Sequence, residues 1–137
     1  MQYLLDTNVL SEGARPRPDP AVMAALEANR AVVCTAAVVV HELRYGVARL
    51  PAGRRREQVS AYVDAILRSS LLVLPYDDRA ARWHADQRAT ADSAGRGIGF
   101  ADGMVAATAA VYGLSVVTRD VTGFAPMDVP VVSWWRD

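Results

Sequence analysis

The sequence ADGMVAATAAVYGLSVVTRD, residues 101–120, contains an apolar helix followed closely by an apolar strand. Residues 101–112 are small or apolar at nearly every position, which is typical of a buried helix, and Gly113 can end that helix. Residues 115–118 read Ser-Val-Val-Thr, a short run of the kind found in buried strands. Strands that are apolar throughout, rather than alternating with polar residues, indicate a parallel sheet covered by helices on both faces.

The same alternation of strands and helices runs through the rest of the chain. We expect strands at residues 2–5, 31–35, 71–74, 115–118 and 129–132, and helices at residues 21–29, 38–50, 54–69, 78–94 and 101–112. Three prolines within residues 15–20 exclude a helix interior there and predict a surface connection. The sequence therefore predicts one domain, residues 1–137, with a three-layer α/β/α fold around a central parallel sheet.

Length and composition narrow the class of protein. The chain has 137 residues, 52% of them hydrophobic, and a formal net charge of zero, so it can bury a core and is not a disordered protein. The single cysteine, Cys34, excludes a disulfide framework and a cysteine-based zinc site. The first residues lack the features of a signal peptide, and the longest apolar run, residues 31–40, is too short to cross a bilayer. We therefore expect a soluble, cytoplasmic protein.

All 15 basic residues are arginine, and the chain contains no lysine. A P-loop places a lysine on the nucleotide phosphates, and pyridoxal phosphate enzymes bind their cofactor through a lysine. Both classes are therefore excluded.

Four carboxylates stand in stretches where an apolar sequence gives no structural reason for a charge. Asp6 follows the first strand, and Asp120 follows the strand at residues 115–118, so both belong to the sheet edge where α/β proteins bind ligands. Asp102 is the only charged residue of its helix, and Glu42 shares a helix face with apolar neighbours three and four positions away. Carboxylates are rarely buried unless they are paired or bind a metal.

Each of these carboxylates also has a purely structural interpretation. Asp6 could cap a turn and Asp120 could be a turn residue. Asp102 could complement the dipole of its helix, and Glu42 could be a solvated helix residue. As a group, however, four acids at strand ends and helix starts favour a shared site.

A shared site for four carboxylates needs a cation. Like charges a few ångströms apart repel one another, and oxygen ligands suit hard ions such as Mg²⁺ or Mn²⁺. His41 and His84 lack ligand partners at metal-binding spacing, so we expect structural or surface roles for them. A carboxylate site with such an ion, and without a serine or cysteine nucleophile, indicates phosphoryl chemistry with an activated water.

Four blocks of the sequence resemble the signature blocks of PIN domains. They are Leu4-Leu5-Asp6-Thr7-Asn8, residues 40–46 (VHELRYG), residues 100–109 (FADGMVAATA) and Val117-Thr118-Arg119-Asp120. Their order along the chain is most similar to that of the VapC/FitB-type toxins of bacterial toxin–antitoxin modules. The resemblance implies an α/β/α fold, a Mg²⁺- or Mn²⁺-dependent ribonuclease, a homodimer, and neutralisation by a small VapB/FitA-like antitoxin.

The resemblance also assigns roles to individual residues. The family's acidic quartet falls on Asp6, Glu42, Asp102 and Asp120, which would be both the catalytic residues and the metal ligands. Asn8 and Thr118 match the polar positions that would orient these carboxylates through hydrogen bonds. Two alternatives stay open: a catalytically silent PIN-like module that binds RNA or protein, and a metal phosphohydrolase that acts on DNA.

Three groups of arginines are candidates for RNA binding. They are Arg15 with Arg17, residues 54–56, and Arg79 with Arg82 and Arg88. Arginine binds phosphate well through its planar fork, but each group could also be a solvated helix face. Trp134 and Trp135 favour packing in the core or in a dimer over base stacking.

The helix at residues 54–69 carries an apolar face that a small core could leave partly uncovered. This face consists of Val59, Tyr62, Val63, Ile66 and Leu67. Exposed apolar patches mark partner surfaces, so we expect a partner chain here. An antitoxin segment in this region could place an arginine or a lysine among the four carboxylates.

Overall fold

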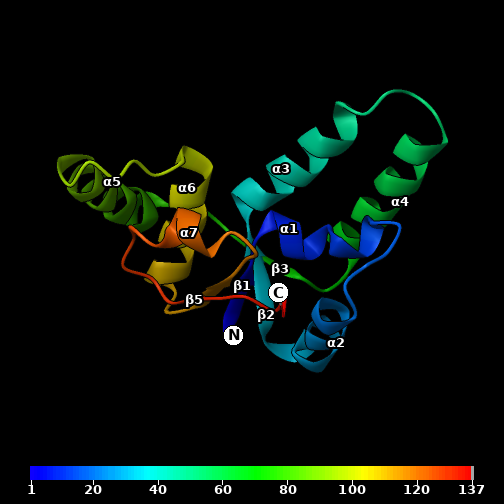
Figure 1. Cartoon of the computed structure of the whole chain (residues 1–137), viewed down its shortest axis with the longest axis horizontal. Helices are drawn as coiled ribbons and strands as arrows, with labels where there is room; N and C mark the ends of the chain where they lie inside the picture. Colours follow the sequence, from blue (N-terminus) through cyan, green and yellow to red (C-terminus); the bar gives the residue numbers. More distant parts are fainter. Residues whose placement is uncertain (137) are drawn as a thin grey trace.

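The computed structural model describes residues 1–136, which form a five-stranded sheet and seven α-helices (Figure 1). The strands are β1 (Tyr3–Leu5), β2 (Val33–Ala36), β3 (Leu72–Leu74), β4 (Ser115–Val117) and β5 (Val131–Val132). The helices are α1 (Thr7–Leu10), α2 (Pro20–Ala28), α3 (Ala37–Ala48), α4 (Arg54–Arg68), α5 (Asp78–Ser93), α6 (Phe100–Val111) and α7 (Val121–Phe124), with two 3₁₀ turns at Glu12–Ala14 and Arg30–Val32.

All four strand pairings are parallel, and the strand order is β3-β2-β1-β4-β5. Leu4 is paired with Cys34 of β2 on one side and with Val116 of β4 on the other. The chain builds outward from β1 to β2 and β3, then returns to place β4 on the opposite side of β1. The direction in which successive strands are added to the sheet therefore reverses between β1 and β4. In open α/β sheets, ligands bind beyond the carboxyl ends of the strands at such a reversal.

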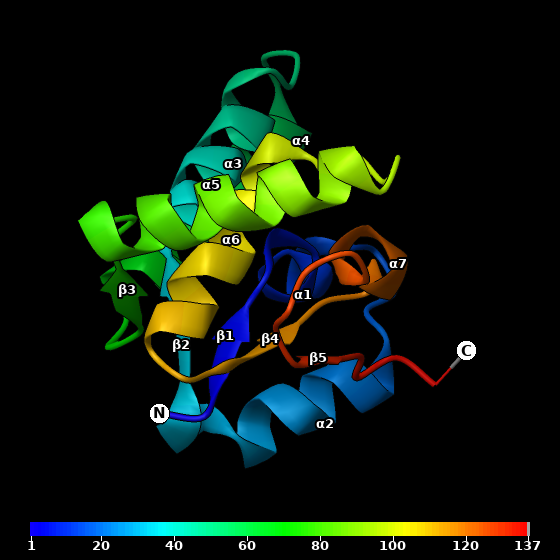
Figure 2. The same cartoon turned by 90° about the vertical axis from the view of Figure 1, so that its left-hand side faces the viewer.

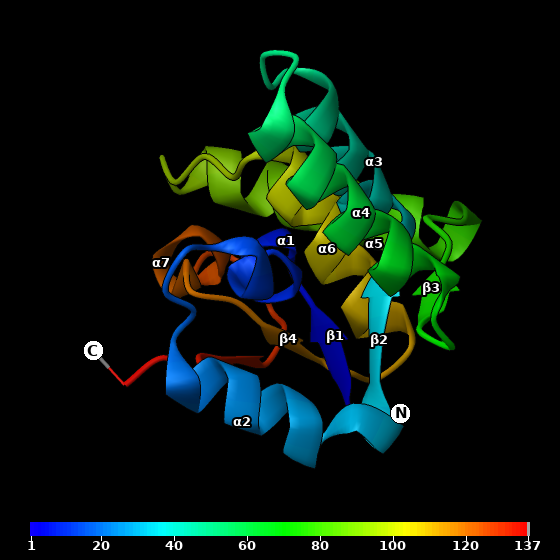
Figure 3. The same ribbon diagram turned by 90° about the vertical axis from the view of Figure 1, so that its right-hand side faces the viewer.

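Helices cover both faces of the sheet, as Figures 2 and 3 show. In both views α2 lies on one side of the strands, and α5 and α6 lie on the other. The buried core joins the strands to both layers; Val22 of α2 and Val105 of α6, for example, are fully buried. The predicted three-layer α/β/α fold with a central parallel sheet is confirmed.

Helices α3 and α4 form a hairpin that extends away from the sheet (Figure 1). Arg44 of α3 and Asp64 of α4 form an ion pair across the hairpin, with Nη1 and Oδ1 2.5 Å apart. The apolar face of α4 is covered by the core only in part: Val63 is buried, and the other four residues are partly buried. The face is therefore partly uncovered, as expected, and Tyr62 and Ile66 line a groove between α2 and α4.

Two short helices were absent from the predicted elements. Both α1 and α7 have four residues, too few for a helical period to show in the sequence. Each begins at a capping carboxylate: Asp6 accepts a hydrogen bond from the backbone N–H of Thr7, and Asp120 accepts one from Gly123. The capping interpretation of Asp6 is therefore correct, but it does not exclude a second role for the same carboxylate.

Other differences lie at the edges of the predicted elements. The second strand begins at Val33 and not at residue 31, because residues 30–32 form a 3₁₀ turn. Strand β3 is an edge strand with Leu72 and Val73 exposed, so an apolar run here does not mean burial on both faces. Trp135 is buried and Trp134 packs edge-on against Tyr3, which confirms the expected packing role for these rings. No helix among residues 1–136 is long and apolar enough to span a membrane.

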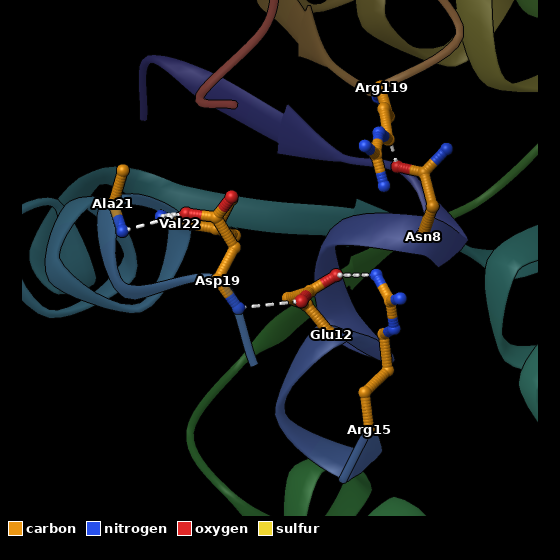
Figure 4. Close-up of polar contacts among 7 residues, drawn as sticks. All are labelled: Asn8, Glu12, Arg15, Asp19, Ala21, Val22 and Arg119. Carbon is orange, nitrogen blue, oxygen red and sulfur yellow. Dashed lines mark hydrogen bonds and ion pairs between the residues drawn. The ribbon is translucent and has the colours of Figure 1, made fainter. Parts of the chain in front are cut away.

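A buried carboxylate holds the connection before α2 in place (Figure 4). Glu12 is 2% exposed; its Oε1 pairs with Arg15 at 3.3 Å, and its Oε2 accepts a hydrogen bond of 2.8 Å from the backbone N–H of Asp19. Asp19 in turn caps α2 by accepting from the N–H groups of Ala21 and Val22. Glu12 therefore links the proline-rich surface connection to the start of the next helix.

We predict that Glu12→Ala lowers the free energy of unfolding by about 1–3 kcal/mol, because it leaves the partly buried N–H of Asp19 without an acceptor. Glu12→Gln keeps an oxygen at that position and is expected to lose less stability. Urea unfolding of both variants and the parent at pH 7 measures the difference. Equal stabilities of parent and Glu12→Ala would contradict the assigned role of this carboxylate.

Candidate active site

Asp6 lies at the point where the strand order reverses. It follows β1 directly, and its backbone N–H donates to the carbonyl of Val117 in β4 over 3.0 Å, so the parallel pairing continues to this residue. Its side chain is 6% exposed. The oxygen Oδ1 accepts from the N–H of Thr7 at 2.8 Å, and Oδ2 accepts from the hydroxyl of Thr118 at 2.8 Å. Both bonds fix the orientation of the carboxylate.

Thr118 links Asp6 to two further residues of the predicted site. Its hydroxyl oxygen accepts a hydrogen bond from the side-chain amide of Asn8 at 3.1 Å and another from the backbone N–H of Asp120 at 3.1 Å. Asn8 Oδ1 accepts from the N–H of Arg119, which ties α1 to the end of β4 (Figure 4). Thr118 is fully buried. Its hydroxyl thus connects the acids that follow β1 and β4.

Glu42 comes from the middle of α3 and is partly buried. Its Oε1 accepts a hydrogen bond of 2.9 Å from the hydroxyl of Thr7, the residue after Asp6. The interpretation of Glu42 as a simple solvated residue is therefore wrong. Sequence analysis did not identify Thr7, although its place between Asp6 and Asn8 was a usable signal.

Asp102 lies in the first turn of α6, and Asp120 lies before α7. Both side chains border Gly123: a Cβ at that glycine would lie 2.5 Å from Asp120 Oδ2 and 3.0 Å from Asp102 Oδ2. A Cβ at Gly99 would also lie 3.5 Å from Asp102 Oδ2. The carboxylates of Asp102 and Asp120 therefore both lie beside Gly123, where the lack of a side chain leaves room for them. Neither glycine was predicted as a site residue.

The two histidines lie outside this group. His84 is buried in α5, and its Nδ1 hydrogen-bonds with the hydroxyl of Tyr76 at 2.9 Å. His41 is exposed on α3. The expectation of structural or surface roles is confirmed for both. The single cysteine, Cys34, is buried within β2.

The chain is similar to known proteins over most of its length. The PIN domain family matches residues 3–128. The chain belongs to the PIN-domain family. It is 39% identical to "VapC ribonuclease Y4jK" of Sinorhizobium fredii over 97% of each protein.

Solved structures agree with this assignment. The crystal structure of FitAcB from Neisseria gonorrhoeae contains a chain that is 36% identical, with a TM-score of 0.85 and coverage of 99% of this chain and 100% of that one. A second structure, VapBC-5 from Mycobacterium tuberculosis, a member of the VapBC family of toxin–antitoxin systems, is 30% identical, with a TM-score of 0.70 and 96% of both chains covered.

Two carboxylates of this PIN domain, Asp102 and Asp6, have raised pKa values. Burial is the main cause that raises the pKa of Asp102 to about 6, and the charges of Asp6, Asp120 and Glu42 add to it. Burial also raises the pKa of Asp6, partly opposed by the hydrogen bonds from Thr118 and Thr7. Among residues 1–136, no hydrogen bond or ion pair reaches the side chain of Asp102. Its charge is therefore balanced by no protein group that the structure describes.

This donor set fits a hard divalent cation. It consists of carboxylate oxygens only, and one of the carboxylates, Asp102, accepts no hydrogen bond from residues 1–136. A cation would relieve the repulsion that, together with burial, raises the pKa of Asp102. Within the described part of the chain, however, no three acidic, histidine or cysteine side chains are already close enough to hold one ion. An ion bound by three of these carboxylates would therefore need them closer together than they lie in this structure.

We predict that Asp102→Asn stabilises the metal-free protein at neutral pH. A carboxyl with a pKa raised from 3.8 to about 6 binds its proton more tightly in the folded state, so ionisation costs stability as pH rises from about 4 to about 6, and the full cost remains above that range. Allowing for solvent screening, Asp102→Asn is expected to gain about 1–2 kcal/mol at pH 7.5 and almost nothing at pH 4.

Urea unfolding in EDTA at the two pH values measures this gain. Asp86→Asn, which removes an exposed carboxylate of α5, serves as the control and is expected to show no such pH dependence. A marked loss of stability in Asp102→Asn at pH 7.5 would mean that Asp102 mainly stabilises the start of α6.

Proposed function

We propose that this protein is a metal-dependent endoribonuclease toxin, a single PIN domain that hydrolyses RNA phosphodiester bonds in the cytoplasm. The observation that carries the proposal is the group of four carboxylates near the ends of β1 and β4, where burial and the neighbouring carboxylate charges raise the pKa of Asp102. The relative named VapC ribonuclease, which the chain matches over nearly its full length, supports RNA as the substrate.

The mechanism assigns one task to each acidic side chain. A bound Mg²⁺ or Mn²⁺ would supply Lewis-acid activation of a water and neutralise charge on the phosphate. Asp6 would be its central ligand, oriented by the hydroxyl of Thr118 and the N–H of Thr7. Glu42 and Asp102 would complete the ligand set, and Asp120 would contribute when the phosphate of the substrate is present.

Polar neighbours keep the carboxylates in orientation during this reaction. The amide of Asn8 donates to Thr118, so the hydroxyl proton of Thr118 remains directed at Asp6. Thr7 holds Glu42 through its hydroxyl and Asp6 through its N–H. A catalytically silent module is disfavoured because all four acids are retained and interact with one another. Hydrolysis of DNA is disfavoured because the matched relative is named a ribonuclease.

We expect RNA cleavage by the purified protein to require a divalent ion. The four proposed ligands offer only oxygen, so EDTA should abolish cleavage, and Mg²⁺ or Mn²⁺ should restore it. Gel analysis of end-labelled RNA before and after addition of the ions provides the measurement. Undiminished cleavage in excess EDTA would exclude the proposed chemistry.

Substitutions in the site should separate metal ligands from orienting residues. Asp6→Asn and Asp102→Asn should each abolish cleavage while the protein remains folded. Thr118→Val removes the donor to Asp6 but leaves the carboxylates in place, and is expected to lower kcat/KM by about 10–100-fold. Thr118→Ser keeps the hydroxyl and serves as the matched control. Wild-type cleavage by Asp102→Asn would exclude this residue from the metal site.

We also propose that the toxin is a homodimer and that an antitoxin neutralises it. Similarity to a member of the VapBC family of toxin–antitoxin systems supports such a partner. A groove of about 580 Å³ between α2 and α4 is open to receive an apolar segment, and its lining includes Met23, Leu26, Tyr62 and Ile66. A cation from the same partner chain, set among the four carboxylates, would compete with the metal ion.

The two parts of this proposal can be tested separately. Light scattering on the purified chain at micromolar concentration should give the mass of a dimer. Co-purification from the native host should recover the product of the neighbouring open reading frame, and that partner should inhibit cleavage less as the Mg²⁺ concentration rises. A monomer would contradict the first part, and the absence of a co-purified partner would contradict the second.

A further inference from the structure

One exposed face of α3 combines an aromatic ring with a guanidinium, close to Glu42. The side chain of Tyr45 is 57% exposed, although large apolar rings are usually covered. The guanidinium carbon of Arg49 lies 5.4 Å from the centre of the Tyr45 ring, and the His41 ring lies 6.1 Å from it at a tilt of 34°. Successive members of this row are four residues apart, so they share a helix face.

A hollow begins at the proposed site and runs beside this face of α3. Its volume is about 330 Å³, and its lining includes Thr7, Glu42 and three arginines: Arg15, Arg49 and Arg55. Gly46, one turn beyond Glu42, also lines it, and a Cβ at this glycine would meet no atom within 4 Å. Arg49 thus belongs both to the aromatic row and to the hollow.

Two of the arginines along the hollow are free to bind an anion. Some exposed arginines elsewhere pair with an acid one turn away on their own helix, as Arg68 does with Asp64 and Arg82 does with Asp78. Within residues 1–136, neither Arg49 nor Arg55 forms an ion pair. Two uncompensated guanidinium groups beside a site for phosphodiester chemistry attract an anionic strand and repel a basic peptide.

The spacing along α3 suits a short stretch of single-stranded RNA. Tyr45 and Arg49 follow Glu42 by three and seven positions, which correspond to about 5 Å and about 10 Å along the helix axis. Nucleotides of a stacked strand follow one another by about 3.4 Å. The face therefore spans roughly two or three nucleotides next to the phosphate that would be cut.

We propose that this face binds the RNA that flanks the scissile bond, with the ring of Tyr45 stacked on a base and with Arg49 and Arg55 bound to a backbone phosphate in the hollow. Arg15 is a weaker contributor, because it already pairs with Glu12. The assignment rests on the proposed function, since it takes RNA as the substrate. It adds a subsite for the neighbouring nucleotides, outside the acidic quartet.

Binding of a fluorescent single-stranded RNA oligomer to the cleavage-deficient Asp102→Asn protein tests the proposal. In this background Tyr45→Ala should raise Kd about tenfold, whereas Tyr45→Phe, which keeps the ring, should leave Kd nearly unchanged. Arg49→Gln and Arg55→Gln should each reduce the slope of log Kd against log salt concentration by about 0.7, while Tyr45→Ala should not change this slope. Arg68→Gln, at the far end of α4, is the matched control and should alter neither quantity.

Each result has a defined meaning. If the parent protein cleaves RNA but Tyr45→Ala, Arg49→Gln and Arg55→Gln bind it as tightly and with the same salt slope as their background, the subsite is wrong and the proposed function stands. If the parent does not cleave RNA, the proposed function itself fails. Variants that bind RNA normally but lose the co-purified protein partner would assign this face to a protein and overturn the proposal. All the substituted side chains except Asp102 are more than one-third exposed, and thermal melts confirm that the variants fold.

Discussion

The parallel pairing of β1 with β4 is the constraint on which the rest of the site depends. It brings together residues more than a hundred positions apart in the chain, so that the hydroxyl of Thr118 can donate to Asp6. The same pairing creates the reversal of strand order at which the sheet edge is open to a ligand. If β4 shifted by one residue, Thr118 would point to the opposite face and the bond to Asp6 would be lost.

The ionised carboxylates of Asp6 and Asp102, one buried and the other partly buried, lower the stability of the folded protein at neutral pH. Burial and the neighbouring carboxylate charges disfavour the ionised form of Asp102, which is why its pKa is raised. Gly123 makes the arrangement possible, because a side chain there would fill the space beside Asp102 and Asp120. Carboxylates with raised pKa values in such a position are typical of functional sites.

Much of this organisation could be predicted from the sequence, because the signals are local. The apolar runs identify the strands, and a lone charge in an apolar helix identifies Asp102 as unusual. The contacts of Thr7 with Glu42 and of Gly123 with Asp102 could not be predicted, because each joins residues of different elements. The contact of Gly99 with Asp102 is local, but a glycine before a helix has many other uses. The four-residue helices α1 and α7 were missed because their stability comes from capping carboxylates and tertiary packing, and not from helical periodicity.

Asp6 and Asp120 follow strands of the sheet and Asp102 lies in the first turn of α6, whereas Glu42 is carried by the α3–α4 hairpin that extends away from the sheet (Figure 1). The distance from Glu42 to the other three acids therefore depends on how α3 packs, whereas the positions of Asp6 and Asp120 depend on the strands that they follow. A molecule that binds the hairpin and changes its packing would change the spacing of the charges without entering the space between them.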